Sequence, residues 1–148
     1  MKKTDYLSTL FVGIDIGSRT NVVSAIDFNR EYFIRMKPVP NAKEGAEILE
    51  SLLVDVLSAH HEFKHVIIGM ESTGFYGVHI ANYLSASDML SPFGTEVYCL
   101  NPKEVAKYKE SFNSINKNDG IDSFVIADFA RVGRITIKPW RGAQYLAL

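Results

Sequence analysis

The feature that most constrains the fold of this chain is an acidic residue inside an apolar segment near the N-terminus. Residues 10–16 read Leu-Phe-Val-Gly-Ile-Asp-Ile, a hydrophobic run typical of a strand that is buried on both faces. Asp15 interrupts this run, and a carboxylate in a buried strand is costly unless it is paired or binds a metal. A strand-end aspartate bonded to loop amides is the structural alternative. Gly13 and Gly17 remove side chains around Asp15, which suits the close approach of a ligand.

The segments that follow indicate the fold class. Apolar strands are expected at 21–28 and 31–37, and Pro38 and Pro40 are expected to end the second of these. Their short connections predict an antiparallel meander with the first strand. Strands at 66–70 and 96–100 are separated by helical segments, which predicts parallel crossovers. The sequence therefore predicts an α/β fold of the ribonuclease-H-like type, with a mixed sheet of three antiparallel strands and then two parallel ones, and helices on both faces.

Helix signals support this order of elements. Asn41 with Glu44 three residues later forms a capping-box pattern, and apolar residues repeat at helical spacing from there to His60. Further helices are expected at 78–84, after the Asn101-Pro102 pair, and at 121–132. We expect residues 1–9 to be an N-terminal tail, 10–134 a single domain, and 135–148 a C-terminal extension.

Composition narrows the class of protein. The 148 residues are 47% hydrophobic and 22% charged, which is typical of a globular domain and not of a disordered chain. A single cysteine, Cys99, excludes a disulfide framework and is expected to be a buried strand residue. No apolar run reaches transmembrane length, and no signal-peptide core follows the basic start at Lys2 and Lys3. We therefore expect a cytoplasmic protein without membrane contact.

Charge is distributed unevenly along the chain. Residues 1–100 carry a net charge of −4, whereas residues 101–148 carry +3. The simpler interpretation is an ordinary solvated surface. The alternative is that the basic side chains of the second region face nucleic-acid phosphates near the acidic residues. The candidates are Lys103, Lys107, Lys109, Lys117, Arg131 and Arg134.

Three more carboxylates are candidates for one site with Asp15. Glu71 follows the strand at 66–70 directly, and ligands in open α/β sheets bind outside the carboxyl ends of strands. Asp119 and Asp122 are three residues apart, so on a helix they share a face, which continues into core-type residues. Each has a structural alternative: Glu71 could serve as a helix-capping partner, and Asp119 could cap a helix with Asp122 in its first turn.

Together the four carboxylates suit a hard divalent cation. Mg²⁺ or Mn²⁺ prefers oxygen ligands, and two such ions can activate a nucleophile and stabilise the leaving oxygen in phosphodiester cleavage. No His and Cys residues have zinc spacing, so a zinc site is not predicted. Ser72 and Thr73 could donate hydrogen bonds to a phosphate, although helix capping is simpler. Phe75 and Tyr76 could stack on bases, although packing in the core is simpler.

At these positions the sequence resembles a known family, the N-terminal domain of the insertion-sequence transposases with a DEDD tetrad, relatives of the Piv invertase and of the RuvC resolvase. The specific motifs are Glu71-Ser72-Thr73-Gly74-Phe75-Tyr76 and Lys117-Asn118-Asp119-Gly120-Ile121-Asp122. Gly-Ile-Asp at 13–15 and the Asn-Pro that ends 97–102 add weaker support. The sequence departs from the family pattern at Ser18, Asn118 and Ser123, and none of these departures removes a carboxylate.

The resemblance implies a catalytic and metal-binding tetrad at Asp15, Glu71, Asp119 and Asp122, holding Mg²⁺ or Mn²⁺, with two ions expected. It implies DNA strand cleavage and exchange at the ends of an insertion sequence and at its target, in a homo-oligomer, with a structured noncoding RNA as a guide in such systems. It also implies a second domain, so that the domain alone is incomplete. The expected nucleic-acid-binding residues are Ser72, Thr73, Tyr76, Lys103, Lys107, Lys117 and Arg131.

Two other classes remain open at this point. Gly-Ile-Asp-Ile-Gly-Ser, followed by a strand ending in Asp27, also resembles the first phosphate loop of actin-like or sugar-kinase-like ATPases. Those proteins need a second large lobe, which 148 residues do not supply. The other alternative is a non-catalytic nucleic-acid-binding assembly module with the same fold.

Overall fold

A computed structural model describes residues 3–71, 75–112, 121–133 and 135–140. Its centre is a five-stranded mixed sheet with the strand order β3-β2-β1-β4-β5. Strands β1 (Thr9–Asp15), β2 (Thr20–Ile26) and β3 (Tyr32–Pro40) form an antiparallel meander, and β4 (His65–Glu71) and β5 (Glu96–Leu100) extend it in parallel with β1. The predicted mixed sheet is therefore confirmed.

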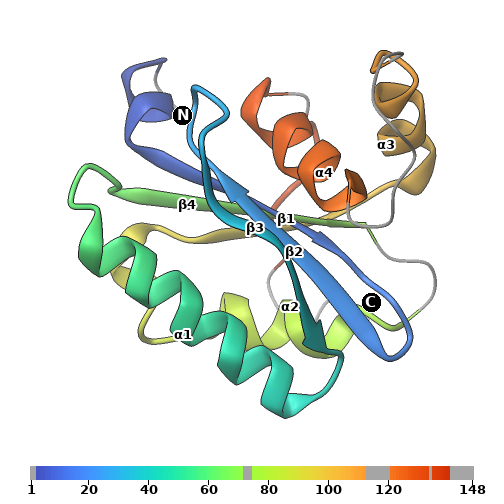
Figure 1. Cartoon of the computed structure of the whole chain (residues 1–148), viewed down its shortest axis with the longest axis horizontal. Coiled ribbons are helices and arrows are strands. Elements are labelled where there is room, and N and C mark those ends of the chain that lie inside the picture. Colours follow the sequence, from blue (N-terminus) through green and yellow to red (C-terminus); the bar gives the residue numbers. More distant parts are fainter. Residues whose placement is uncertain (1–2, 72–74, 113–120, 134, 141–148) are drawn as a thin grey trace.

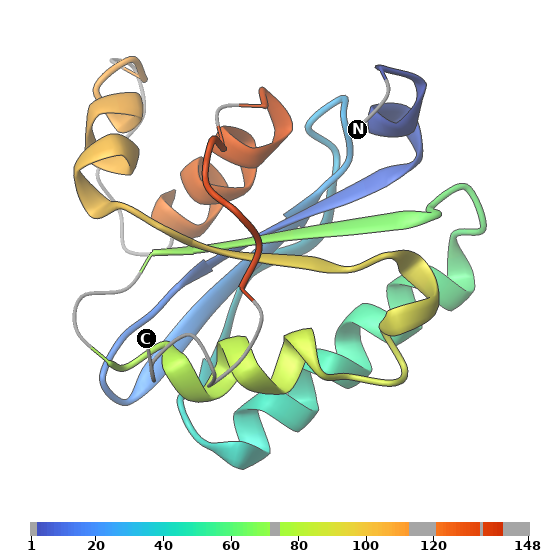
Figure 2. The same cartoon turned by 180° about the vertical axis from the view of Figure 1, so that it is seen from behind.

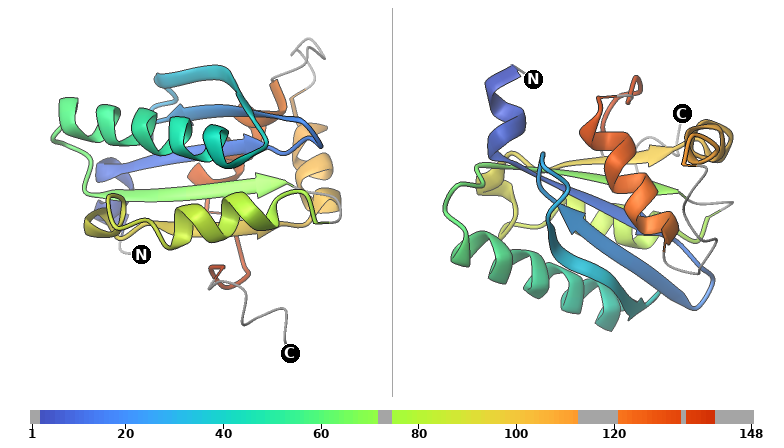
Figure 3. Two further views of the ribbon diagram at one scale, coloured as in Figure 1. Left: turned by 90° about the horizontal axis from the view of Figure 1, so that it is seen from below. Right: turned by 45° about the horizontal axis from the view of Figure 1, so that its top comes forward.

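Two pairs of helices cover the two faces of the sheet (Figures 1 and 2). Helices α1 (Lys43–Ala59) and α2 (Val78–Ser85) lie on one face, and α3 (Pro102–Lys109) and α4 (Ile121–Arg131) lie on the other. The left view of Figure 3 looks onto the face of the sheet that α1 and α2 cover. Helices on both faces were predicted, and the predicted last helix at 121–132 differs from α4 by one residue.

Strand alternation divides the core between these layers. In β1, Leu10, Val12 and Ile14 join the cluster under α1 and α2, whereas Phe11 packs with Ala127 and Ala130 of α4. A third cluster, centred on Leu100, Val105 and Phe129, joins α3 to α4. Residues of odd number in β1, including Asp15, therefore face the layer of α3 and α4.

Two local expectations were wrong. Pro38 does not end the third strand, which continues to Pro40 as its last residue, because β3 lies at the edge of the sheet, where a missing N–H costs no ladder hydrogen bond. Asn41 does not cap the first helix: its N-cap is Ala42, which makes no side-chain cap. Asn101 does act as predicted, because its Oδ1 accepts from the Lys103 N–H at 2.9 Å and Pro102 opens α3.

Segments at both ends pack against the sheet. The short 3₁₀ helix η1 (Lys3–Ser8) carries Tyr6, whose ring stacks on Phe28 with centroids 6.0 Å apart. After α4 the chain crosses the β5 edge toward α2, as Figure 2 shows. There the Trp140 N–H donates to the Val97 carbonyl at 2.6 Å and its indole Nε1 donates to Asn82 Oδ1 at 2.7 Å. Within the described residues, none of the helices has the length and apolar character needed to cross a membrane.

Candidate functional site

Asp15 and Glu71 are neighbours at the end of the sheet. They are the last residues of β1 and β4, and they are direct partners in the parallel register of these strands. Ile67, two strand alternations before Glu71, packs in the cluster under α4, so Glu71 faces that layer, as does Asp15. The two carboxylates therefore lie side by side on one face, at the carboxyl ends of parallel strands.

Two glycines, each two residues before one of these carboxylates, determine where α4 lies. Gly13 and Gly69 are partners in the same register. A Cβ at Gly13 would overlap the Ser123 carbonyl oxygen and the Ala127 nitrogen, and one at Gly69 would lie 3.1 Å from Leu100 Cδ1 and 3.3 Å from Ile126 Cγ2. Gly13 therefore admits the backbone of α4, and not a ligand as its sequence context suggested. Gly17 serves a turn, because a Cβ there would overlap the Thr20 carbonyl oxygen.

This close approach brings Asp122 to the same end of the sheet. Asp122 lies in the first turn of α4, and the neighbouring Ser123 is fully buried. The Ser123 hydroxyl is 2.7 Å from that of Ser24 in β2, which fixes the start of the helix on the sheet. The expected inward stripe of α4 is confirmed, since Val125 and Ile126 are buried.

Electrostatics link the three carboxylates. Burial raises the pKa of Glu71, and the nearby charges of Asp15 and Asp122 raise it further, while the Lys109 ammonium lowers it. Lys109 Nζ forms an ion pair with Asp122 Oδ1. Three acidic groups and one ammonium thus act on one another at this edge of the sheet.

The carboxylates of the site that the structure describes are the ligand type that a hard divalent cation prefers, although their side chains are not gathered closely enough to hold one. Asp15, Glu71 and Asp122 supply carboxylate oxygens, the ligand type that Mg²⁺ and Mn²⁺ prefer. Among the described residues, however, no three His, Cys, Asp or Glu side chains are grouped closely enough to hold an ion as they stand. The fourth predicted carboxylate, Asp119, lies outside the described residues, as do Lys117, Ser72 and Thr73.

The rim of the site is formed by loops that one asparagine joins. The Asn41 Nδ2 donates to the Gly17 carbonyl at 2.6 Å and to the Tyr76 carbonyl at 3.0 Å. It therefore ties the loop after β1 to the segment after β4. The expectation that Phe75 and Tyr76 pack in the core was wrong, because they are 82% and 55% exposed. Both rings are therefore on the surface, in the segment that precedes α2.

The predicted basic residues separate into two groups. Lys103 and Lys107 are exposed on α3, the helix that ends at the acidic site. Arg131 is instead nine residues beyond Asp122 on α4, about 13 Å along the helix axis. Its Nε donates to Asp128 at 2.6 Å, and its side chain is 15% exposed. Arg131 therefore belongs to the framework of the domain.

Asp128 is a framework residue that the sequence interpretation missed. It is fully buried and accepts hydrogen bonds from Arg30, Arg131 and the Tyr108 hydroxyl. Burial raises the pKa of Asp128, but these hydrogen bonds outweigh it and hold the pKa below its ordinary value. The only sequence signal was its place on the inward stripe of the last helix, with Arg131 three residues later. Asp128 joins α4 to α3 and to the β2–β3 hairpin.

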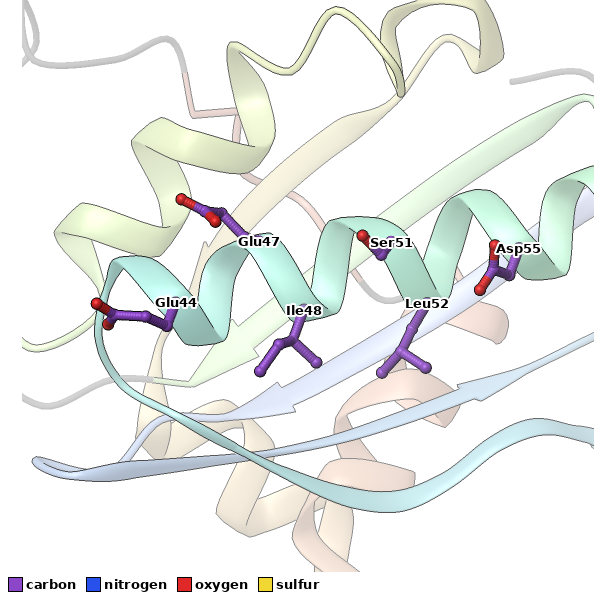
Figure 4. Close-up of a pocket in the computed structure, with 6 residues that line it drawn as sticks. All are labelled: Glu44, Glu47, Ile48, Ser51, Leu52 and Asp55. Atoms are coloured by element: carbon purple, nitrogen blue, oxygen red, sulfur yellow. The ribbon is translucent and has the colours of Figure 1, made fainter.

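A shallow hollow on α1 does not offer a comparable site. All of its lining residues lie on this one helix (Figure 4), and three of them are acidic, so it is unsuited to a phosphate. They are Glu44, Glu47, Ile48, Ser51, Leu52 and Asp55. The hollow lies on the layer opposite to α3 and α4.

Comparison with known proteins agrees with this geometry. Residues 12–148 match the DEDD transposase family of the IS110 type, described as a transposase. The chain belongs to this transposase family. The match covers Asp15, Glu71, Asp119 and Asp122, and membership removes the ATPase alternative. Family membership implies the use of a metal and the binding of DNA. No curated protein sequence matched the chain.

Solved structures give the same fold. The chain is similar to RuvC of Thermus thermophilus in complex with a Holliday junction substrate, with a TM-score of 0.53 at 17% identity over 89% of this chain and 99% of that one. A second structure of Thermus thermophilus RuvC matches with a TM-score of 0.54 at 17% identity, over 88% of this chain and 99% of that one. The transposase domain therefore has a RuvC-like, ribonuclease-H-like fold, as predicted.

Proposed function

We propose that this domain carries out metal-dependent DNA strand cleavage and exchange during transposition of an insertion sequence. The metal is Mg²⁺ or Mn²⁺, with two ions, and the ligands are Asp15, Glu71, Asp119 and Asp122. The single observation that supports this best is the pairing of Asp15 with Glu71 at the strand ends, beneath a helix whose first turn carries Asp122. Bound metal would supply an activated nucleophile and stabilise the leaving oxygen.

The residues of this chain set the conditions for that chemistry. The Gly13–Gly69 pair holds α4 against the sheet, so that Asp122 is presented from a rigid element beside two strand ends. Burial raises the pKa of Glu71, and the charges of Asp15 and Asp122 raise it further, so a nearby divalent cation would favour its charged form. The carboxylates therefore bind and orient the metal.

The surface around the carboxylates suits a DNA backbone. Lys103 and Lys107 are exposed on α3, and the exposed Tyr76 ring offers a stacking surface at the rim. We include Ser72, Thr73 and Lys117 in the DNA-binding set because of their place in the family motifs, and we leave Arg131 out because it bonds to Asp128. The partners are DNA at the element ends and at the target, a guide RNA, and further copies of the chain.

A metal-dependent thermal shift tests this proposal. Saturating Mn²⁺ at about one hundred times its Kd would stabilise the wild type by about 2.7 kcal/mol, a rise in Tm of roughly 5–10 °C. Asp15→Ala should lose most of this rise, because it removes a ligand from the pair with Glu71. Asp55→Ala, an exposed acid on α1, is the matched control and should respond as the wild type does. Equal shifts in wild type and Asp15→Ala would contradict the assignment of the site.

A further inference from the structure

Lys109 places a positive charge among the carboxylates of the site. It is the last residue of α3, and its Nζ pairs with Asp122 Oδ1. The two side chains are 38% and 37% exposed, so the pair is neither buried nor fully solvated. One of the three described carboxylates is thus already neutralised by the protein itself.

The reach of Lys109 extends beyond Asp122. Its ammonium also lowers the pKa of Glu71, against the combined effects of burial, Asp15 and Asp122. The charge therefore acts at the point where the three carboxylates come together. A cation bound by these groups would occupy the same electrostatic minimum.

The neighbouring residue, Tyr108, fixes the backbone at Lys109 through its contacts with α4. The Tyr108 hydroxyl donates to Asp128 Oδ2 at 2.7 Å, and the Tyr108 ring packs edge-on against Phe129 with centroids 5.5 Å apart. Both partners are on α4, so the end of α3 is fixed to the helix that carries Asp122. The backbone of Lys109 is thereby held in place while its flexible stem lets the ammonium move.

We propose that Lys109 is an internal counter-ion of the site, which competes with the divalent cation for Asp122 and must be displaced when the metal binds. This inference rests on the proposed function, in which Asp122 is a metal ligand. Displacement exchanges one ammonium for one divalent ion at Asp122, and it frees the ammonium at the edge of the site. Lys109 is then a positioning residue that sets metal affinity.

The expected change in metal affinity follows from the exposure of the Lys109–Asp122 ion pair. Half-exposed ion pairs of this kind contribute about 0.2–1 kcal/mol. Removal of the competitor should therefore tighten metal binding by up to roughly five-fold. The effect is large enough to measure by calorimetry.

The test is a calorimetric titration of the full chain with Mn²⁺ alone. Lys109→Met should bind Mn²⁺ roughly 1.4- to five-fold more tightly than the wild type. Lys64→Met, which removes the same charge at the opposite end of β4, is the control and should match the wild type. Affinity of Lys109→Met equal to or weaker than that of the wild type would overturn the inference.

Thermal unfolding supplies a second readout that does not depend on activity. Without metal, Lys109→Met and Lys109→Gln should both melt below the wild type, because the carboxylates lose their counter-charge. Saturating Mn²⁺ should remove this difference, and a difference that persists would overturn the inference. If neither the wild type nor any variant binds Mn²⁺, both the proposed function and the role of Lys109 fail. If the wild type binds and Lys109→Met binds no more tightly, only the role of Lys109 fails.

Discussion

The two faces of the sheet are built in opposite ways. Under α1 and α2 the sheet presents large apolar side chains, such as Leu10, Val12 and Ile68, to leucines and isoleucines of the helices. Under α4 the sheet presents Gly13 and Gly69, and the backbone of α4 at Ser123 and Ala127 lies directly over Gly13. The α1 and α2 face is filled by large side chains, whereas the α4 face combines apolar packing around Phe11 with a direct backbone contact at Gly13.

The two faces therefore differ in how much change in packing they tolerate. Bulky side chains can repack by small rotations, so the α1 and α2 face tolerates adjustment. Backbone contact leaves no such freedom, and the α4 face carries the groups whose geometry matters. Ser24, Ser123 and Asp128 are fully buried on that face, each in a specific polar contact. The layer of α3 and α4 thus carries both specific polar contacts and the site residues.

Alanine substitutions at Gly13 and Gly69 test the backbone contact on the α4 face most directly. Gly13→Ala should lower the free energy of unfolding by more than about 3 kcal/mol, because the added Cβ meets the backbone at Ser123 and Ala127. Gly69→Ala should cost only about 1 kcal/mol, since the side chains of Leu100 and Ile126 can shift. Urea denaturation measures both, and equal losses would mean that the helix adjusts freely on this face.

Asp128→Asn tests the buried polar contacts in the layer of α3 and α4. It should cost about 2–3 kcal/mol at neutral pH, because two arginines lose a buried carboxylate. Hydrogen bonds hold the pKa of Asp128 below its ordinary value, so its stabilisation is complete above pH about 4 and is lost as pH falls through the folded pKa. The difference from wild type should therefore shrink in acid. Asp55→Asn on α1 is the control, and a pH-independent loss in Asp128→Asn would contradict this account.

Glu71→Gln should give the smallest effect, with the opposite sign. The pKa of Glu71 is raised by burial and by the two neighbouring carboxylates, so its charge opposes folding above the folded pKa and has no such effect below the unfolded pKa. In chelator, the variant should be more stable than wild type at pH 8, by less than about 1 kcal/mol, and unchanged at pH 4. Denaturation at both pH values measures this, and a loss of stability at pH 8 would show that the carboxylates do not repel.

Much of the architecture was predictable because it follows from local patterns. The apolar run around Asp15 and the helical spacings indicated the strands, the helices and their order, and Asn101-Pro102 marked the start of α3 correctly. The position of Glu71 at a strand end was also visible in the sequence. The family motifs added the grouping of Asp15 and Glu71 with Asp122 that spacing alone left open.

The unpredicted features depend on contacts between distant segments. The role of Gly13 requires knowledge of which helix crosses β1, and the sequence suggested a ligand instead. Asn41 looked like a helix cap, yet its amide joins two loops more than 30 residues apart in sequence. The pairing of Lys109 with Asp122 likewise depends on how α3 docks on α4, which no periodicity encodes.

The path of the chain after α4 has a consequence for how the molecule behaves at high concentration. An exposed edge strand can recruit a strand from another molecule and start aggregation. Here Trp140 lies across β5 and uses the Val97 carbonyl, while β3 at the opposite edge carries Pro38 and Pro40. Both borders of the sheet are therefore poor templates for strand addition, so copies of this domain should meet through helices and loops, and not by joining their sheets.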